Sequence, residues 1–300
     1  MKINLPKIIL VSGLSLFYAC SSAPTTEETA TDPLKDTSSN TKTGNAQVVL
    51  YNLPSPMETS QLLRDAGAKF DGTFMNKSSN SKEYKTSEIQ ALNLGVYGAD
   101  LSYAGIFENS QECMSLLKAI NGLCAELGIN GAFNETTAER IEKNKNNKDS
   151  LVEIISSSFW EADGSLKENN RTGISSLLIA GGWIEGMYLA TKVYEKTKSE
   201  KIKSRLINEP QLNALKNIIA MLENEKNIVS AQPALLEGMK NLRSSYEKIS
   251  FGKSETKFVT DEKSHKTKLE TTSDVKVSDE QFKAVVNAVV NLRNTIVAVK

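Results

Sequence analysis

Two apolar segments, 91–107 and 174–190, limit the possible folds more than any other feature of the chain. Each is apolar nearly all round a helix, which is typical of a buried helix or a membrane span. Each holds only about 17 residues, fewer than the ~20 that cross a bilayer, and carries a carboxylate near its middle, Asp100 or Glu185. We therefore expect two central helices that pack against each other inside a soluble bundle.

Glycines recur along both segments, at Gly95 and Gly98 in the first and at Gly181, Gly182 and Gly186 in the second. A glycine inside a helix costs about 1 kcal/mol relative to alanine, so several together indicate a compensating gain. Close approach of the two backbones is one such gain. It predicts that Gly186→Leu overpacks the contact and destabilises the fold by about 1–3 kcal/mol. The alternative is a kink or break at the adjacent pair of glycines, which would open a cavity.

The two carboxylates need partners, because a buried and unpaired carboxylate is expensive. Asp100 and Glu185 each have a tyrosine three residues later on the same helical face, Tyr103 and Tyr188, and Trp183 adds an indole donor. These five residues are our candidate ligand-binding set. They fit a polar network that fixes the helix register, a polar cavity for a small ligand, or an acid–base pair. The spacing does not show whether the two acids meet.

Helix start and stop signals fill most of the remaining chain. A short helix is expected at 55–68 and longer ones at 202–224 and 233–249, while the polar stretch 252–277 predicts a long loop or a short hairpin. The stretch 278–300 opens with Ser-Asp-Glu-Gln, a capping-box pattern, and then repeats apolar residues three or four apart. We predict an all-α fold, a single bundle of about eight or nine helices over residues 46–300.

Composition argues against several classes of function. The chain has 36 basic and 36 acidic residues, whereas nucleic-acid binding needs a basic surplus or a basic stripe. The single histidine, His265, argues against catalytic triads and histidine zinc sites, so we expect no metal and no cofactor. Cys113 and Cys124 lie about 16 Å apart along one predicted helix, too far for a disulfide. We expect both to be buried apolar residues.

The N-terminus has the pattern of a secretory signal. Two lysines precede an apolar run at 8–18 that is too short to span a bilayer, and Ala19 and Cys20 follow. This junction resembles the lipobox of bacterial lipoproteins. The resemblance implies that residues 1–19 are removed and that Cys20 becomes the first residue. It would carry diacylglycerol on its sulfur and an acyl chain such as palmitate on its amino group. An ordinary cleaved signal with an incidental cysteine is the alternative.

Residues 20–45 are rich in Thr, Ser, Pro and Asp and show no periodicity, which predicts a flexible tether. Ser21, directly after Cys20, resembles the same position in lipoproteins that are sent on to the outer membrane. Whether the folded body faces the periplasm or the exterior stays open.

Three sequence blocks carry a wider resemblance: Leu94–Tyr103, Asn147–Leu151 and Gly181–Tyr188. Together they resemble a family of uncharacterised helical lipoproteins from Gram-negative bacteria. The resemblance implies an all-helical body behind a lipid anchor and supplies no activity. Imelysin-like lipoproteins have a Gly-x-His-x-x-Glu signature that indicates metal or haem handling, and residues 181–185 lack its histidine.

We therefore expect a lipid-anchored cell-envelope protein that is not an enzyme and serves as a helical binding or scaffold module. Its expected partners are the membrane, through the lipid, and an envelope protein or a small ligand, but not nucleic acid. Two alternatives stay open. One is a small-ligand-binding protein with its pocket between 91–107 and 174–190. The other is a carboxylate-based hydrolase that uses Asp100 and Glu185.

Overall fold

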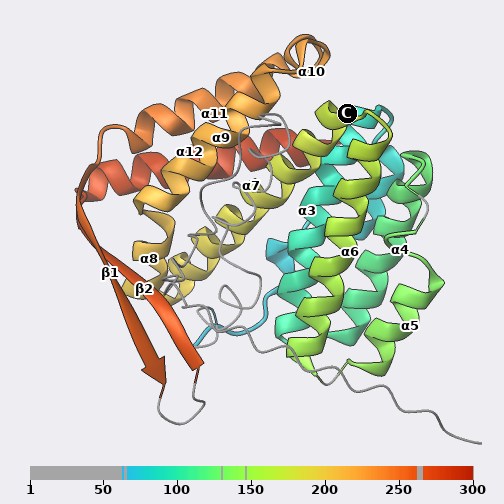
Figure 1. Ribbon diagram of the computed structural model, residues 1–300, viewed down its shortest axis with the longest axis horizontal. Helices are drawn as coiled ribbons and strands as arrows, with labels where there is room; N and C mark the ends of the chain where they lie inside the picture. Colours follow the sequence, from blue (N-terminus) through green and yellow to red (C-terminus); the bar gives the residue numbers. More distant parts are fainter. Residues whose placement is uncertain (1–62, 64–65, 130, 146, 262–265, 300) are drawn as a thin grey trace, which may run out of the picture. The chain divides into compact units, whose positions relative to one another are not determined.

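The computed structural model describes residues 63, 66–129, 131–145, 147–261 and 266–299. Those residues hold ten α-helices, two short 3₁₀ helices (η) and one two-stranded hairpin, which confirms the predicted all-α class (Figure 1). The elements in chain order are η1 Gly72–Phe74, η2 Ser78–Glu83, α3 Ser87–Ile106, α4 Ser110–Glu126, α5 Glu135–Lys143, α6 Lys148–Glu168, α7 Thr172–Thr197, α8 Glu200–Leu206, α9 Glu209–Glu223, α10 Lys226–Ala231, α11 Pro233–Tyr246, β1 Ser250–Asp261, β2 Lys266–Lys276 and α12 Asp279–Val297.

Some predictions fall outside this part of the chain. The signal at 1–19, Cys20, the tether at 20–45 and nearly all of the helix expected at 55–68 lie outside the described residues. Within the described residues, every helix is too short or too polar to cross a bilayer.

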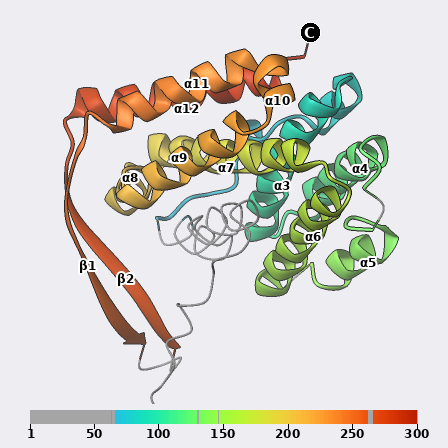
Figure 2. The same ribbon diagram turned by 45° about the horizontal axis from the view of Figure 1, so that its top comes forward.

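Helices α3 and α7 are the centre of the bundle and lie against each other (Figures 1 and 2). Fifteen of the twenty residues of α3 are buried, and so are fifteen of the twenty-six residues of α7. They are apolar nearly all round because other helices cover several of their sides. Helices α4, α6 and α12 contact α3, while α6, α8, α9 and α12 contact α7. The prediction of two buried helices that pack together is confirmed.

Glycine sets the distance between these two helices. A Cβ atom on Gly95 would lie 2.1 Å from the carbonyl oxygen of Leu178, and one on Gly181 would lie 1.9 Å from that of Leu92. Carbon atoms pack favourably only at about 3.5–4.0 Å, so only glycine allows this approach. Helix α7 runs unbroken through these positions, so a break there is wrong, while a kink stays a prediction.

Gly186 takes no part in the helix contact. A Cβ atom built on it would have no neighbouring heavy atom within 4 Å. The prediction that Gly186→Leu overpacks the contact is therefore wrong. The two backbones meet around Gly95 and Gly181, and one turn further along α7 the glycine faces open space instead.

Polar caps begin the helices that surround this pair. The side chains of Asn109, Asn134 and Asn147 each accept a hydrogen bond from the backbone N–H three residues later, at α4, α5 and α6. Ser278 and Gln281 form the predicted capping box of α12. The β-branched residues of α12 therefore follow a helix, as its apolar spacing predicted.

The C-terminal half is divided more finely than we predicted. The stretch 202–224 holds two helices, α8 and α9, because Asn208 caps a new helix that has Pro210 in its first turn. A further short helix, α10, precedes α11. These divisions give the ten helices of the described residues, against the eight or nine expected.

The stretch between α11 and α12 forms the hairpin that we gave as one of two alternatives. Strands β1 and β2 pair antiparallel, from Ser250 opposite Lys276 to Asp261 opposite Lys266. A register shift between Phe251 and Ser254 interrupts the ladder, and Phe251 packs against the core. The hairpin is longer than the short one expected, with twelve residues in β1 and eleven in β2.

Candidate functional site

The two carboxylates of the central helices lie next to each other, and an arginine pairs with one of them. Arg293 of α12 donates from Nε to Oε2 of Glu185 at 2.9 Å and from Nη2 to Oε1 at 3.1 Å. Both Asp100 and Glu185 are fully buried. A bidentate arginine–carboxylate pair of this kind is short and oriented, so it fixes α12 on α7.

The surroundings of Asp100 favour its neutral form. Its Oδ2 accepts the backbone N–H of Asn76 at 3.0 Å, while among the described residues no N–H or hydroxyl group donates to Oδ1. Burial, and then the charge of Glu185, raise the pKa of Asp100 well above its ordinary value. A proton on Asp100 that is donated to Glu185 explains the carboxyl oxygen that has no other partner. With Asp100 in its neutral form, the group would hold one negative charge on Glu185 and one positive charge on Arg293.

The two tyrosines of the candidate set lie in different surroundings. The guanidinium carbon of Arg293 lies 4.3 Å from the ring centroid of Tyr188, a cation–π contact that adds Tyr188 to the polar group. The Tyr103 hydroxyl instead accepts the backbone N–H of Asp71 at 3.1 Å, and its ring stacks on Phe70. Tyr103 therefore holds the segment before η1 against α3.

Sequence reasoning missed Arg293, the ion-pair partner of Glu185. Its position carries a usable signal. Arg293 lies four residues after Val289 and three before Ile296, within the apolar stripe of the C-terminal helix. A charged residue inside a buried stripe needs an opposite charge, and Asp100 and Glu185 are the acids that the central helices offer.

A cavity of about 270 Å³ lies beside the α3–α7 pair and does not include the two acids. Helices α3, α6, α7, α8 and α9 line it. Two members of the candidate set, Tyr103 and Trp183, lie on its wall, whereas Asp100, Glu185 and Tyr188 do not. The structure thus separates the candidate residues into a buried polar group and a cavity.

Small residues and aromatic rings line the cavity together. Gly98 of α3 and Gly186 of α7 line it, with Phe159 and Trp160 supplied by α6. The ring of Phe159 sits directly on Gly98, because a Cβ there would lie 2.1 Å from its Cζ. Trp160 is 43% exposed, so the cavity wall continues to the surface of the described chain on the α6 side.

The two cysteines of the described residues lie in the core of the bundle. Cys113 and Cys124 are buried and unbonded, as predicted, and burial raises the pKa of each thiol to about 12. Within the described chain, His, Cys, Asp and Glu side chains make no group of three that would hold a metal ion.

No protein-family model, curated protein or solved structure matches the chain. The functional conclusions therefore depend on the geometry of the cavity and of the buried polar group.

Proposed function

We propose that the protein is a lipid-anchored binding protein of the cell envelope and that its cavity holds a small apolar molecule. The binding element is the space between α3, α6 and α7. Apolar and aromatic walls with a few polar groups are the usual lining of a small-molecule site. The signal sequence and Cys20 support the anchor, which mass spectrometry of the mature protein tests directly.

Gly186 is the observation that carries this proposal. Glycine inside a helix costs about 1 kcal/mol, and at Gly95 and Gly181 the close backbone contact compensates for that cost. At Gly186 no packing compensates, because a Cβ atom there would meet nothing within 4 Å. The missing side chain leaves room in the cavity, and a bound molecule is the physical use for that room.

The hydrolase alternative finds less support in the geometry. Asp100 and Glu185 are enclosed by protein, and Glu185 is held by both nitrogens of the Arg293 fork. Acid–base work on a substrate needs a carboxyl group within hydrogen-bond reach of that substrate. The polar group instead holds α12 against α7, which favours the interpretation of a polar network that fixes helix packing.

Tryptophan fluorescence tests the proposal, because the only two tryptophans of the chain, Trp160 and Trp183, both line the cavity. The full-length chain with Cys20→Ser, which prevents lipidation, is titrated with 1-dodecanol as an uncharged apolar probe. We expect saturable quenching or a spectral shift. A titration without a saturable change contradicts the proposal.

A matched pair of variants locates the effect. Gly186→Leu fills the cavity and should weaken the response to 1-dodecanol by about tenfold or more, while the fold is retained. Gly122→Leu makes the same change inside α4, at an exposed glycine that also has no neighbour within 4 Å but lies outside the cavity. Equal loss in both variants, or in neither, would place the probe elsewhere.

A further inference from the structure

We infer that the cavity takes an uncharged molecule with an apolar body and a hydrogen-bond acceptor, such as the carbonyl oxygen of a ketone or an ester. This inference rests on the proposed function and adds the chemical class of the ligand. The side-chain amide of Gln211, on the α9 side of the cavity wall, carries it.

Gln211 is held in a fixed orientation at the start of α9. Its backbone N–H donates to Oδ1 of Asn208, the residue that caps this helix, at 2.9 Å. Gln211 is only 4% exposed, and its Oε1 accepts the indole N–H of Trp183 at 2.9 Å. An indole nitrogen only donates, so the oxygen of the amide must face Trp183 and Nε2 must face away from it.

The N–H groups of Nε2 lack an acceptor within the described chain. No described residue accepts a hydrogen bond from Nε2. Nε2 is also not one of the described polar atoms that are sealed inside the protein without a partner, so it reaches open space. Gln211 lines the cavity, which supplies that space. A donor on an otherwise buried side chain calls for an acceptor on the molecule that fills the cavity.

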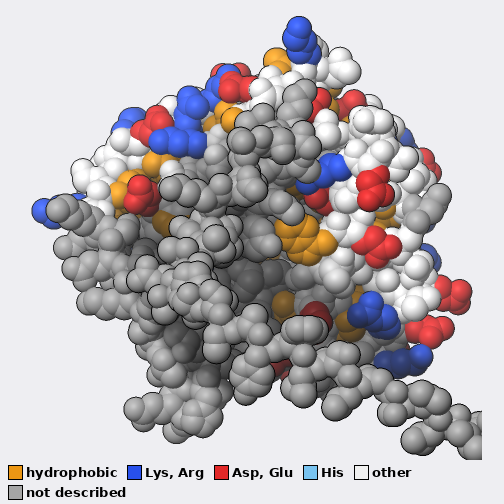
Figure 3. All heavy atoms as spheres, in the orientation of Figure 1, with side chains coloured by type: hydrophobic (Ala, Val, Ile, Leu, Met, Phe, Trp, Pro, Cys, Tyr) orange, Lys and Arg blue, Asp and Glu red, His pale blue; other side chains and the backbone are white. Residues whose placement is uncertain are grey.

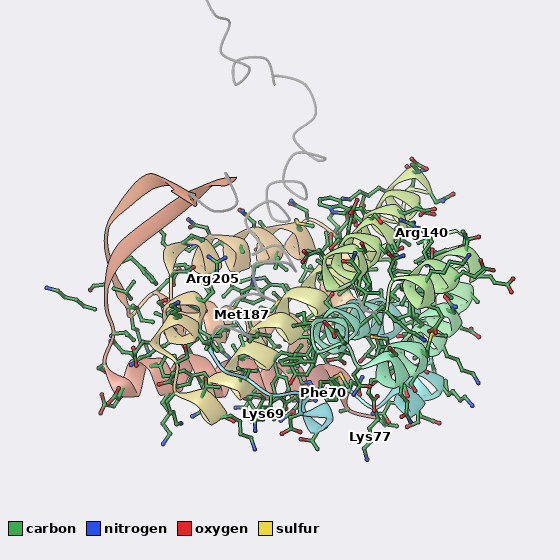
Figure 4. The ribbon with its side chains drawn as sticks, turned by 90° about the horizontal axis from the view of Figure 1, so that it is seen from below. Lys69, Phe70, Lys77, Arg140, Met187 and Arg205 are labelled. Carbon is green, nitrogen blue, oxygen red and sulfur yellow. The ribbon has the colours of Figure 1, made fainter. Side chains whose placement is uncertain are left out.

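The two charged residues of the described wall, Asp163 and Arg205, are already engaged. Asp163 of α6 accepts from the Ser175 hydroxyl at 2.5 Å and from the Lys167 ammonium at 2.5 Å. Arg205 of α8, which lies beside Met187 of α7 in Figure 4, has an interaction partner within the protein. A charged head group would therefore enter an apolar cavity without a counter-charge, at a large cost in desolvation. This favours an uncharged ligand.

The described surface is not built to attract a charged ligand either. In Figure 3 acidic and basic side chains are interspersed, and this view shows no broad face of one sign. Charge of one sign around a cleft is what concentrates charged ligands there. An uncharged ligand needs no such face.

The rest of the wall fits an apolar body. Phe159, Trp160 and Met187 offer aromatic and aliphatic surface, and at Gly186 no side chain occupies the space. Burial of an alkyl chain against such surface is the main favourable contribution to binding. The acceptor of the ligand then meets Nε2 of Gln211.

The test compares two probes of nearly the same shape on the full-length Cys20→Ser chain, with tryptophan fluorescence as the readout. Decan-2-one has a carbonyl oxygen, and 2-methyldec-1-ene has a methylidene group in its place. Gln211→Met keeps a side chain of similar length but has no N–H group. In this variant we expect the affinity for the ketone, relative to the alkene, to fall by about three- to tenfold, the contribution of a neutral hydrogen bond. The ratio cancels any general effect of losing the acceptor of the Trp183 indole.

Ser102→Ala is the matched control. Ser102 also lines the cavity, but its hydroxyl already donates to the carbonyl oxygen of Gly98 at 3.0 Å. The change therefore removes a polar group that has no spare donor. It should leave the ketone-to-alkene ratio of the parent chain unchanged.

Infrared spectroscopy detects the hydrogen bond directly, because a carbonyl group that accepts one absorbs at a lower frequency. The difference between spectra taken with isotope-labelled and unlabelled decan-2-one isolates the band of the ligand. In the parent chain we expect this band below the frequency of the ketone in hexadecane, and in Gln211→Met closer to that frequency. A parent band at the hexadecane frequency overturns the inference, and this measurement decides alone if Gln211→Met does not fold.

The outcomes separate this inference from the proposed function. Saturable binding of 1-dodecanol, with no binding of the ketone or with the same ketone-to-alkene ratio in the parent and in Gln211→Met, overturns the acceptor assignment but leaves an apolar site. A ratio that falls equally in Ser102→Ala overturns the role of Gln211. Binding of none of the three probes overturns both the inference and the proposed function.

Discussion

Arg293 donates two hydrogen bonds to Glu185 across 108 residues of sequence. The pair attaches the C-terminal helix α12 to α7 at the centre of the bundle. Burial beside Glu185 raises the pKa of Asp100 and favours its protonated form, in which the buried charges would balance. This balance makes the stability of the fold sensitive to each member in a different way.

Removing the charge of Glu185 should destabilise the protein strongly. In an Asp100→Asn background, where residue 100 cannot take over the negative charge, Glu185→Gln leaves the Arg293 guanidinium buried without a counter-charge. We expect a loss of about 3–5 kcal/mol in the free energy of unfolding, measured by urea denaturation. Glu195→Gln, which breaks an exposed pair with Lys192, should cost less than about 1 kcal/mol. Similar costs at both sites would show that the buried pair is not a principal contact.

Asp100→Asn should itself be tolerated at neutral pH. The asparagine side chain accepts from the backbone N–H of Asn76 and donates to Glu185, so it reproduces both hydrogen bonds of the protonated acid. A loss of stability as large as that of the Glu185 variant would mean that Asp100 is ionised in the folded protein.

The raised pKa of Asp100 predicts the direction in which the stability of the fold changes with pH. Its pKa is raised in the folded protein by burial and by the charge of Glu185, whereas in the unfolded chain an aspartate releases its proton near about pH 4. The contribution of Asp100 is therefore full below that pH and is lost as the pH rises through the raised pKa. Relative to Asp100→Asn, the parent protein should lose unfolding free energy as the pH increases from about 4. A difference that is constant or grows with pH contradicts the assignment.

The close crossing of α3 and α7 predicts a reversal of the usual effect of glycine-to-alanine changes. Gly95→Ala should destabilise by about 1–3 kcal/mol or more, because its Cβ would lie 2.1 Å from the Leu178 carbonyl oxygen. Gly122→Ala, at an exposed site inside α4, should instead stabilise by about 0.5–1 kcal/mol. Thermal or urea unfolding distinguishes the two, and a neutral Gly95→Ala would contradict the contact.

Thiol labelling tests the anchor and the core together. Cys113 and Cys124 are buried thiols whose pKa is raised to about 12, so at pH 8 they should not react in the folded protein. A lipidated Cys20 has no free thiol and does not react. The mature native protein should therefore show no labelling, and unfolding should release two thiols. One fast-reacting thiol in the native mature protein would argue against acylation of Cys20.

Much of the fold was predictable from local sequence signals. The apolar character of 91–107 and 174–190 indicates burial on all sides, and the capping box at Ser278 depends only on neighbouring residues. These features need no knowledge of distant contacts. The class of the fold followed from them.

The site was less accessible, because it depends on which neighbour covers each face of α7. Periodicity places Gly181 and Gly186 on one helix but cannot show that the first meets a carbonyl group and the second faces a cavity. Likewise, Glu185 and Arg293 are joined only by the packing of α12. The sequence indicates that the buried acids need partners, but only the tertiary structure shows that Arg293 pairs with Glu185.

A crystal structure of the full-length chain grown with 1-dodecanol tests the central proposal most directly. We expect density for the alkyl chain between the Phe159 ring and the Gly186 backbone, with Arg293 and Glu185 still paired and the probe absent from them. A cavity filled by the protein's own side chains, or probe density only outside the space between α3, α6 and α7, would contradict the proposal.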